Sequence, residues 1–217
     1  MTTLDQFESV FNSAVKPLYR YKPILISHAL IVTDLDQDSA NEFAGQVQQL
    51  LAPQKIENWE IITGDQYSST LDLLGLLEGK TTDLICCYRN LHSQAWQHPH
   101  SLGSHLDVLI QMTSSPVLIL PHPEAGYAYA NAYDSERQVL AMTDHMTDDD
   151  VLVTLAAQFT GSGGHLHLAH IEDEMTFNRY IEAISKIETI DTINAQTTIK
   201  HQLLKHPTDY IESCRTA

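Results

Sequence analysis

Two segments of the chain begin with the same pattern, and this repeat constrains the fold more than any other feature. Residues 29–34 read ALIVTD and residues 139–144 read VLAMTD, so each apolar run ends in Thr-Asp. A polar turn follows each run, and apolar residues then recur at the spacing of an amphipathic helix. A strand, a turn and a helix in this order open a βαβ unit, so the sequence predicts two such units. We expect Ser39 and Thr147 to cap the two helices.

The first unit continues as an alternation of strands and helices. Strands are expected at 59–65, 83–88 and 116–120, and helices at 68–79 and 102–113. The segment DLICCY at 83–88 is apolar almost throughout, which is typical of a strand buried on both faces of a parallel sheet. We therefore predict an α/β fold with three layers, α/β/α, around a mainly parallel, Rossmann-like sheet.

The sequence also suggests where the parts of the chain begin and end. We expect an N-terminal helix and lead-in strand, a first unit, a Pro-rich and small-residue linker, and a second unit, at 1–27, 28–123, 124–137 and 138–217. In the second unit we expect strands at 165–173 and 197–204, and a helix at 176–187. Nothing in this unit corresponds to the last helix and strand of the first unit, so we expect it to be incomplete at its C-terminus.

Composition narrows the class of protein. The chain has 28 acidic and 12 basic residues and a formal net charge of −16, which disfavours binding to nucleic acids and to anionic membranes. Three cysteines, two of them adjacent, do not make a disulfide framework. The start of the chain does not resemble a signal peptide and no segment resembles a membrane span, so we expect a cytoplasmic protein.

The ordered set of segments resembles a tandem universal stress protein. LIVTDLDQDSANEFAGQVQQLL is similar to that family's opening strand, aspartate and first helix, and LGSHLDVLIQMTSSPVLIL is similar to its Gly-Ser helix and last strand. VLAMTD and GGHLHLAHIED resemble the opening of a second copy. The resemblance implies a Rossmann-like repeat of two units and a role in stress response or regulation.

The chain departs from the nucleotide-binding members of this family. These members carry a Gly-x-x-Gly pair after the fourth strand, and Tyr88 and Leu91 occupy the two glycine positions here. A Cβ at such positions blocks close approach of the backbone to a phosphate. The resemblance leaves four candidate nucleotide ligands, which are Asp34, Gly103, Ser104 and Asp144. Each aspartate could instead cap its own turn.

The chain contains 12 histidines, several of them between the third strand and the linker. His98 and His100 are the candidate metal ligands, and His165 and His167 form a second closely spaced pair. No Cys-x-x-Cys or His-Glu-x-x-His motif accompanies them, so we predict no metal site. Sensing of metal or of pH by the histidine-rich loop stays open as an alternative.

The chain contains no Gly-x-x-x-x-Gly-Lys-Ser/Thr motif, which binds nucleotide phosphates, and no Gly-x-Ser-x-Gly motif, which carries a nucleophilic serine. We therefore predict a protein that is not an enzyme and needs no cofactor. It would act in stress response or regulation through binding and self-association, as a homodimer or with a regulatory protein partner. The alternative is an adenine-nucleotide binding protein that holds ATP or AMP.

Overall fold

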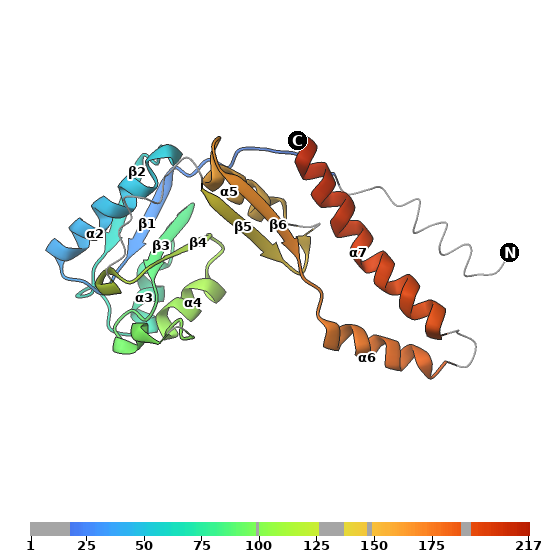
Figure 1. The fold of residues 1–217 in the computed structure, drawn as a ribbon. Coiled ribbons are helices and arrows are strands. Elements are labelled where there is room, and N and C mark those ends of the chain that lie inside the picture. Colours follow the sequence, from blue (N-terminus) through green and yellow to red (C-terminus); the bar gives the residue numbers. More distant parts are fainter. Residues whose placement is uncertain (1–17, 99, 126–136, 147–148, 188–191) are drawn as a thin grey trace. The chain divides into compact units, whose positions relative to one another are not determined.

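The computed structural model describes residues 18–98, 100–125, 137–146, 149–187 and 192–217, and gives no side chains for residues 192–195 and 202. The chain divides into two compact units. One unit is Leu25–Asp134, and the other combines Ser135–Ala217 with the N-terminal segment that ends at Ile24. Each unit is described separately below (Figure 1).

The first unit contains a parallel sheet of four strands in the order β2-β1-β3-β4. The strands are β1 (His28–Val32), β2 (Asn58–Ile62), β3 (Leu84–Tyr88) and β4 (Val117–Leu120). Every residue of β3 is buried, as its apolar sequence predicts. Leu30 and Ile31 of β1 are also fully buried, so the core of this unit follows the two central strands.

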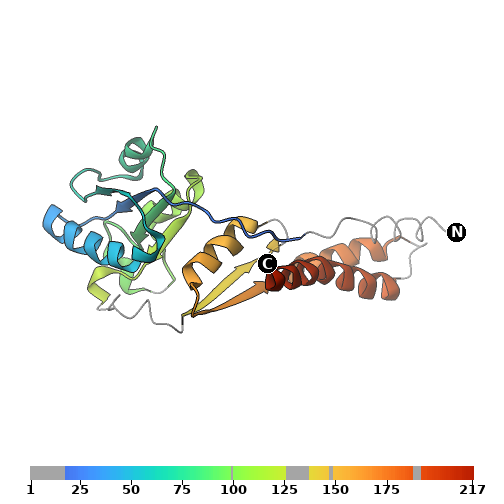
Figure 2. The same cartoon turned by 90° about the horizontal axis from the view of Figure 1, so that it is seen from above.

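Three helices cover the two faces of this sheet. They are α2 (Gln37–Leu50), α3 (Thr70–Leu77) and α4 (Ser104–Met112), and three short 3-10 turns accompany them, η1 (Ala52–Gln54), η2 (Gln94–Gln97) and η3 (Pro123–Ala125). Figure 2 shows the sheet between α2 on one side and α3 with α4 on the other. The predicted three-layer, mainly parallel α/β fold is therefore confirmed.

The helix ends are fixed by local side chains. Ser69 begins α3 through a capping box with Asp72, and Gly79 follows the helix with a φ of 75°. The cap of α2 is Asp36, whose carboxylate accepts the backbone N–H groups of Asp38 and Ser39. The predicted cap at Ser39 is therefore wrong, because an aspartate three residues earlier already accepts these donors.

The second unit contains a parallel sheet of two strands, β5 (Gln138–Thr143) and β6 (His165–His170), joined by α5 (Asp150–Thr160). Two further helices follow, α6 (Glu174–Ser185) and α7 (Thr192–Thr216). Asp149 caps α5, and the predicted cap Thr147 lies outside the described residues.

The strand predicted at 197–204 is wrong, because these residues belong to α7. Thr197, Thr198 and Ile199 have high β propensity, but residues 197–204 are mostly exposed and have little packing of their own. The packed part of α7 comes later, where Tyr210 is 1% exposed in a cluster with Tyr19, Met146 and Val153. Residues 197–204 therefore continue a helix that is anchored by its C-terminal part, and local β propensity does not decide their structure.

Residues 18–24 belong to the second unit. The Tyr19 hydroxyl lies 2.9 Å from the Thr154 hydroxyl, and the backbone N–H of Ile24 donates to the Gln158 side chain at 2.8 Å. Residues 18–27, where a lead-in strand was expected, form neither helix nor strand. The expected N-terminal helix lies outside the described residues.

Candidate functional site

The candidate site lies at the carboxyl edge of β1 and β3 in the first unit. The chain leaves β1 towards β2 on one side and leaves β3 towards β4 on the other, so the strand order reverses between these two strands. Ligands of doubly wound sheets bind at such a reversal. Asp34 follows β1 at this point, as the sequence predicts, and the β3–α4 loop (residues 89–103) leaves β3 beside it.

Both carboxylate oxygens of Asp34 are engaged by the chain itself. Oδ1 accepts a hydrogen bond from the Tyr88 hydroxyl, and Oδ2 accepts the backbone N–H of His92 at 2.7 Å. The Tyr88 hydroxyl also lies 2.6 Å from the Thr33 hydroxyl. Burial and these carboxylate contacts raise the pKa of Tyr88 above its ordinary value, so the phenol stays protonated. Asp34 therefore ties the β3–α4 loop to the end of β1.

Gly103 is the N-cap residue of α4 and has a φ of 86° and a ψ of 149°. This region of backbone space is essentially restricted to glycine. A Cβ on Gly103 would also lie 2.8 Å from the Cα of Asn90. The close approach of the loop therefore explains this glycine without a phosphate. Ser104 follows as the first residue of α4 and is exposed.

Asn90 closes the β3–α4 loop on itself. Its backbone N–H donates to the Leu102 carbonyl at 2.8 Å, and its side chain exchanges two hydrogen bonds with Ser101, each 3.0 Å long. The guanidinium of Arg89 donates to loop carbonyls, among them that of Trp96 at 3.4 Å. The loop thus fills the space beside the start of α4 with its own polar groups.

Tyr88 and Leu91, which occupy the positions of the two family glycines, have a packing role in the structure. Tyr88 ends β3 and Leu91 is 2% exposed, so both act as core residues. The positive φ angles fall instead on Asn90 and His92, at 61° and 57°. Asparagine and histidine adopt this left-handed conformation more readily than most residues, so the loop turns sharply without glycine.

Three aromatic rings contact one another where the loop meets α4, and they come from three different segments. The ring of His92 lies 4.7 Å from that of Tyr67 and 5.5 Å from that of His105, edge-on and tilted respectively. The Tyr67 hydroxyl donates to the Thr33 carbonyl at 3.2 Å, and burial raises the pKa of this tyrosine. Tyr67 follows β2 and was not predicted as a site residue, because no local motif marks it.

His105 is the least satisfied polar group of this cluster. It is 7% exposed, and neither of its ring nitrogens has a hydrogen-bond partner of normal geometry. Burial lowers the pKa of His105, and the neighbouring His92 lowers it further. A backbone hydrogen bond with Leu91 and the charge of Asp34 act in the opposite direction but do not reverse the shift. His105 is therefore neutral in the closed loop near pH 7.

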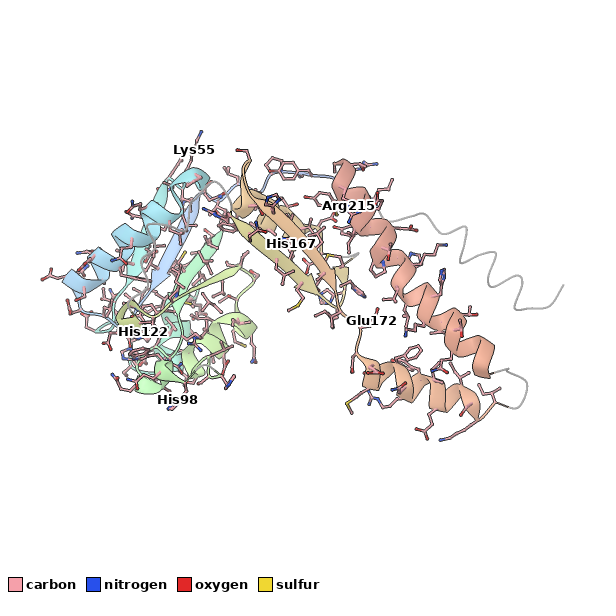
Figure 3. The ribbon with its side chains drawn as sticks, viewed as in Figure 1. Lys55, His98, His122, His167, Glu172 and Arg215 are labelled. Carbon is pink, nitrogen blue, oxygen red and sulfur yellow. The ribbon has the colours of Figure 1, made fainter. Side chains whose placement is uncertain are left out.

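A second ring stack holds the far side of the loop. The ring of Trp96 lies parallel to that of His122, with centroids 4.5 Å apart and an angle of 8°. The same imidazole lies 4.9 Å from the ring of Tyr88. Burial lowers the pKa of His122. His122 and His98 lie at the same end of the first unit (Figure 3).

The candidate metal ligands do not converge. His98 and His100 are both exposed, and the described part of the chain contains no group of three His, Cys, Asp or Glu side chains that could hold a metal ion. His165 and His167 lie on one exposed face of β6, and His167 contacts Gln138 at 2.8 Å.

Asp144 belongs to the second unit, whereas Asp34 belongs to the first. It follows β5, its side chain is 75% exposed, and its carboxylate contacts the imidazole of His145. The structure therefore brings Asp34, Gly103 and Ser104 to one edge of one unit, and places Asp144 at the end of a different sheet.

Comparisons of this chain with protein-family models, curated proteins and solved structures found no match. The resemblance to universal stress proteins therefore rests on the sequence pattern alone. Among the described residues, no helix has both the length and the apolar character needed to cross a membrane.

Proposed function

We propose that this protein is not an enzyme and that it acts in stress response or regulation through binding and self-association. One observation carries the first part of this proposal. The ligand edge of the first unit is filled by the chain itself, because Asp34 binds Tyr88 and His92 while Asn90 packs against Gly103. The filling of this edge by the chain supports a protein that acts without a bound substrate. The stress-related role is supported by the resemblance to universal stress proteins.

Binding of ATP or AMP remains the second candidate, and one feature favours it. Helix α4 has no side-chain cap, and the exposed Ser104 stands at its positive end. A phosphate at this point would have to displace Asn90 and its contacts with Ser101. The nucleotide would also have to compete with two hydrogen bonds for Asp34. These costs favour the closed, ligand-free state.

Self-association is supported by the small sheet of the second unit. This sheet has two strands, so each strand has one edge without a strand partner among the described residues. Leu140 and Met142 lie on the same face of β5 and are 60% and 55% exposed. Open edges and exposed apolar faces favour pairing with another chain. We infer that the partner is a second copy of this protein.

Sedimentation velocity over a range of concentrations tests this proposal. We expect the wild type to form a dimer and Met142→Lys to shift the equilibrium towards the monomer, because a charge on this face opposes its burial. Met112→Lys is the matched control, since Met112 is 67% exposed on α4 of the first unit. A wild type that stays monomeric at every concentration would refute self-association, and a Met142→Lys variant that dimerises normally would refute this surface.

A further inference from the structure

The β3–α4 loop is held closed at two places, and each place includes a buried or stacked histidine. At one end, the backbone N–H of His92 donates to the Asp34 carboxylate, and the ring of His92 contacts that of His105. At the other end, Trp96 stacks on His122. The loop contacts Asp34 through the backbone N–H of His92, and it lies against the start of α4 where Asn90 approaches Gly103.

A proton on His105 would have few groups to stabilise it. The titratable groups around this imidazole are His92 from the loop, Tyr67 from the segment after β2, and Asp34 from the segment after β1. Tyr67 is a neutral phenol that presents a ring edge-on. The Asp34 carboxylate already accepts two hydrogen bonds. An imidazolium at this position would be buried with only the backbone of Leu91 as a weak partner, and this contact does not offset the cost of burial.

His122 is in a similar position at the other end of the loop. Its ring is enclosed between Trp96 and Tyr88, whose hydroxyl is committed to Thr33 and Asp34. The charged groups that act on it are Asp34, Glu124 and Arg89, and the guanidinium of Arg89 opposes a second positive charge. Burial outweighs the two carboxylates, so the closed loop favours the neutral ring.

We propose that the β3–α4 loop is an acid-released latch, in which protonation of His105 and His122 detaches the loop and uncovers Asp34 and the first turn of α4. The latch lies within the first unit and does not depend on the self-association proposed for the second. Release of the loop as the pH falls would open the carboxyl edge of β1 and β3 to a ligand. The sheet beneath the loop would not change.

The sign of this effect follows from the two lowered pKa values. A histidine with a lowered pKa in the closed state binds a proton less readily than the same histidine after release. As the pH falls below about 6.5, the ordinary pKa of histidine, protonation therefore favours the released state. Above that pH both states are neutral at these positions, so the loop stays closed.

Hydrogen exchange measured by mass spectrometry at pH 7.5 and pH 5.0, corrected for the intrinsic pH dependence of exchange, tests the latch. We expect protection of the loop amides, including those of Asn90 and His92, to fall several-fold at pH 5.0. The amides of β3 should keep their protection, because its strand pairing is not titrated. Equal loop protection at both pH values would overturn the proposal, and so would a parallel loss in β3, since that would indicate general unfolding.

Substitutions of the histidines test whether His105 and His122 cause the acid response of the loop. His105→Leu combined with His122→Phe keeps apolar contacts and the stack on Trp96, and we expect loop protection that no longer depends on pH. His105→Gln with His122→Phe is the second version, in case leucine impairs folding. The control is His98→Ala with His100→Ala, which removes two exposed histidines of the same loop and should keep the acid response. A normal acid response in the folded test variants, or its loss in the control, would refute the latch.

Discussion

Replacement of Gly103 by alanine tests whether this glycine serves the loop or a ligand. If the loop keeps its conformation, alanine at position 103 must adopt the φ of 86° and the ψ of 149° that Gly103 has. Its Cβ would then lie 2.8 Å from the Cα of Asn90, whether or not a ligand is bound. Backbone strain of this kind costs about 1–3 kcal/mol. Relief of the clash by movement of the loop costs about 1–3 kcal/mol more.

The expected loss of unfolding free energy is therefore about 2–6 kcal/mol, a large part of the stability of an ordinary domain. Urea unfolding followed by tryptophan fluorescence measures it, since both tryptophans, Trp59 and Trp96, lie in the first unit. With a urea slope of about 2 kcal/mol/M, the midpoint should fall by about 1–3 M.

The matched control for this substitution is Gly75→Ala. Gly75 lies inside α3, and a Cβ there would meet no atom within 4 Å. Alanine should raise the unfolding free energy by about 0.5–1 kcal/mol, because it reduces the conformational entropy of the unfolded chain. A Gly103→Ala variant as stable as the wild type would refute the view that the loop itself requires the glycine.

Further substitutions probe the contacts that surround this loop. Tyr88→Phe keeps the ring but removes the hydroxyl from Asp34, and should lower the unfolding free energy by about 1.5–3 kcal/mol in the same assay; a loss below about 0.5 kcal/mol would contradict the account. Asp36→Ala should lower the melting temperature more than Ser39→Ala, because Asp36 supplies the cap of α2. Capping hydrogen bonds lower the pKa of Asp36, so this contribution should be lost only as the pH falls through that lowered value. Equal melting temperatures for the two variants would refute the assignment of the cap.

The sequence predicts the elements of the first unit well because their signals are local. The apolar run of β3 has the composition of a strand buried on both faces, and the helix predicted at 68–79 contains the observed α3. Signals of this kind depend on residues within one or two turns of each other. The parallel, three-layer fold follows from the order of such elements.

The closed state of the site could not be predicted in the same way. Tyr67, Asp34 and His105 come from three segments that only the folded sheet brings together. Asparagine and histidine favour the left-handed conformation, but most loop residues of these two types do not adopt it, so the sequence does not single out Asn90 and His92. The sequence did predict that bulk replaces glycine after β3, but it could not predict which atoms then fill the space.

In the second unit, a local signal led to a wrong prediction. Local preference favours a strand around Ile199, but Tyr210 packs against Met146 from a helix that includes both segments. The prediction used propensity over a few residues, whereas the packing of α7 depends on contacts with Tyr19 and α5. Such contacts have no counterpart in the local sequence.

The most direct test of the account is isothermal titration of the protein with Mg-ATP at pH 7.5, where the loop should be closed. Ser104→Asp serves as the comparison variant, because it places a negative charge at the start of α4 without the clash that any Cβ at Gly103 would cause. The account predicts no saturable heat for either protein. Saturable binding by the wild type that Ser104→Asp abolishes would show an open phosphate site and contradict the central claim.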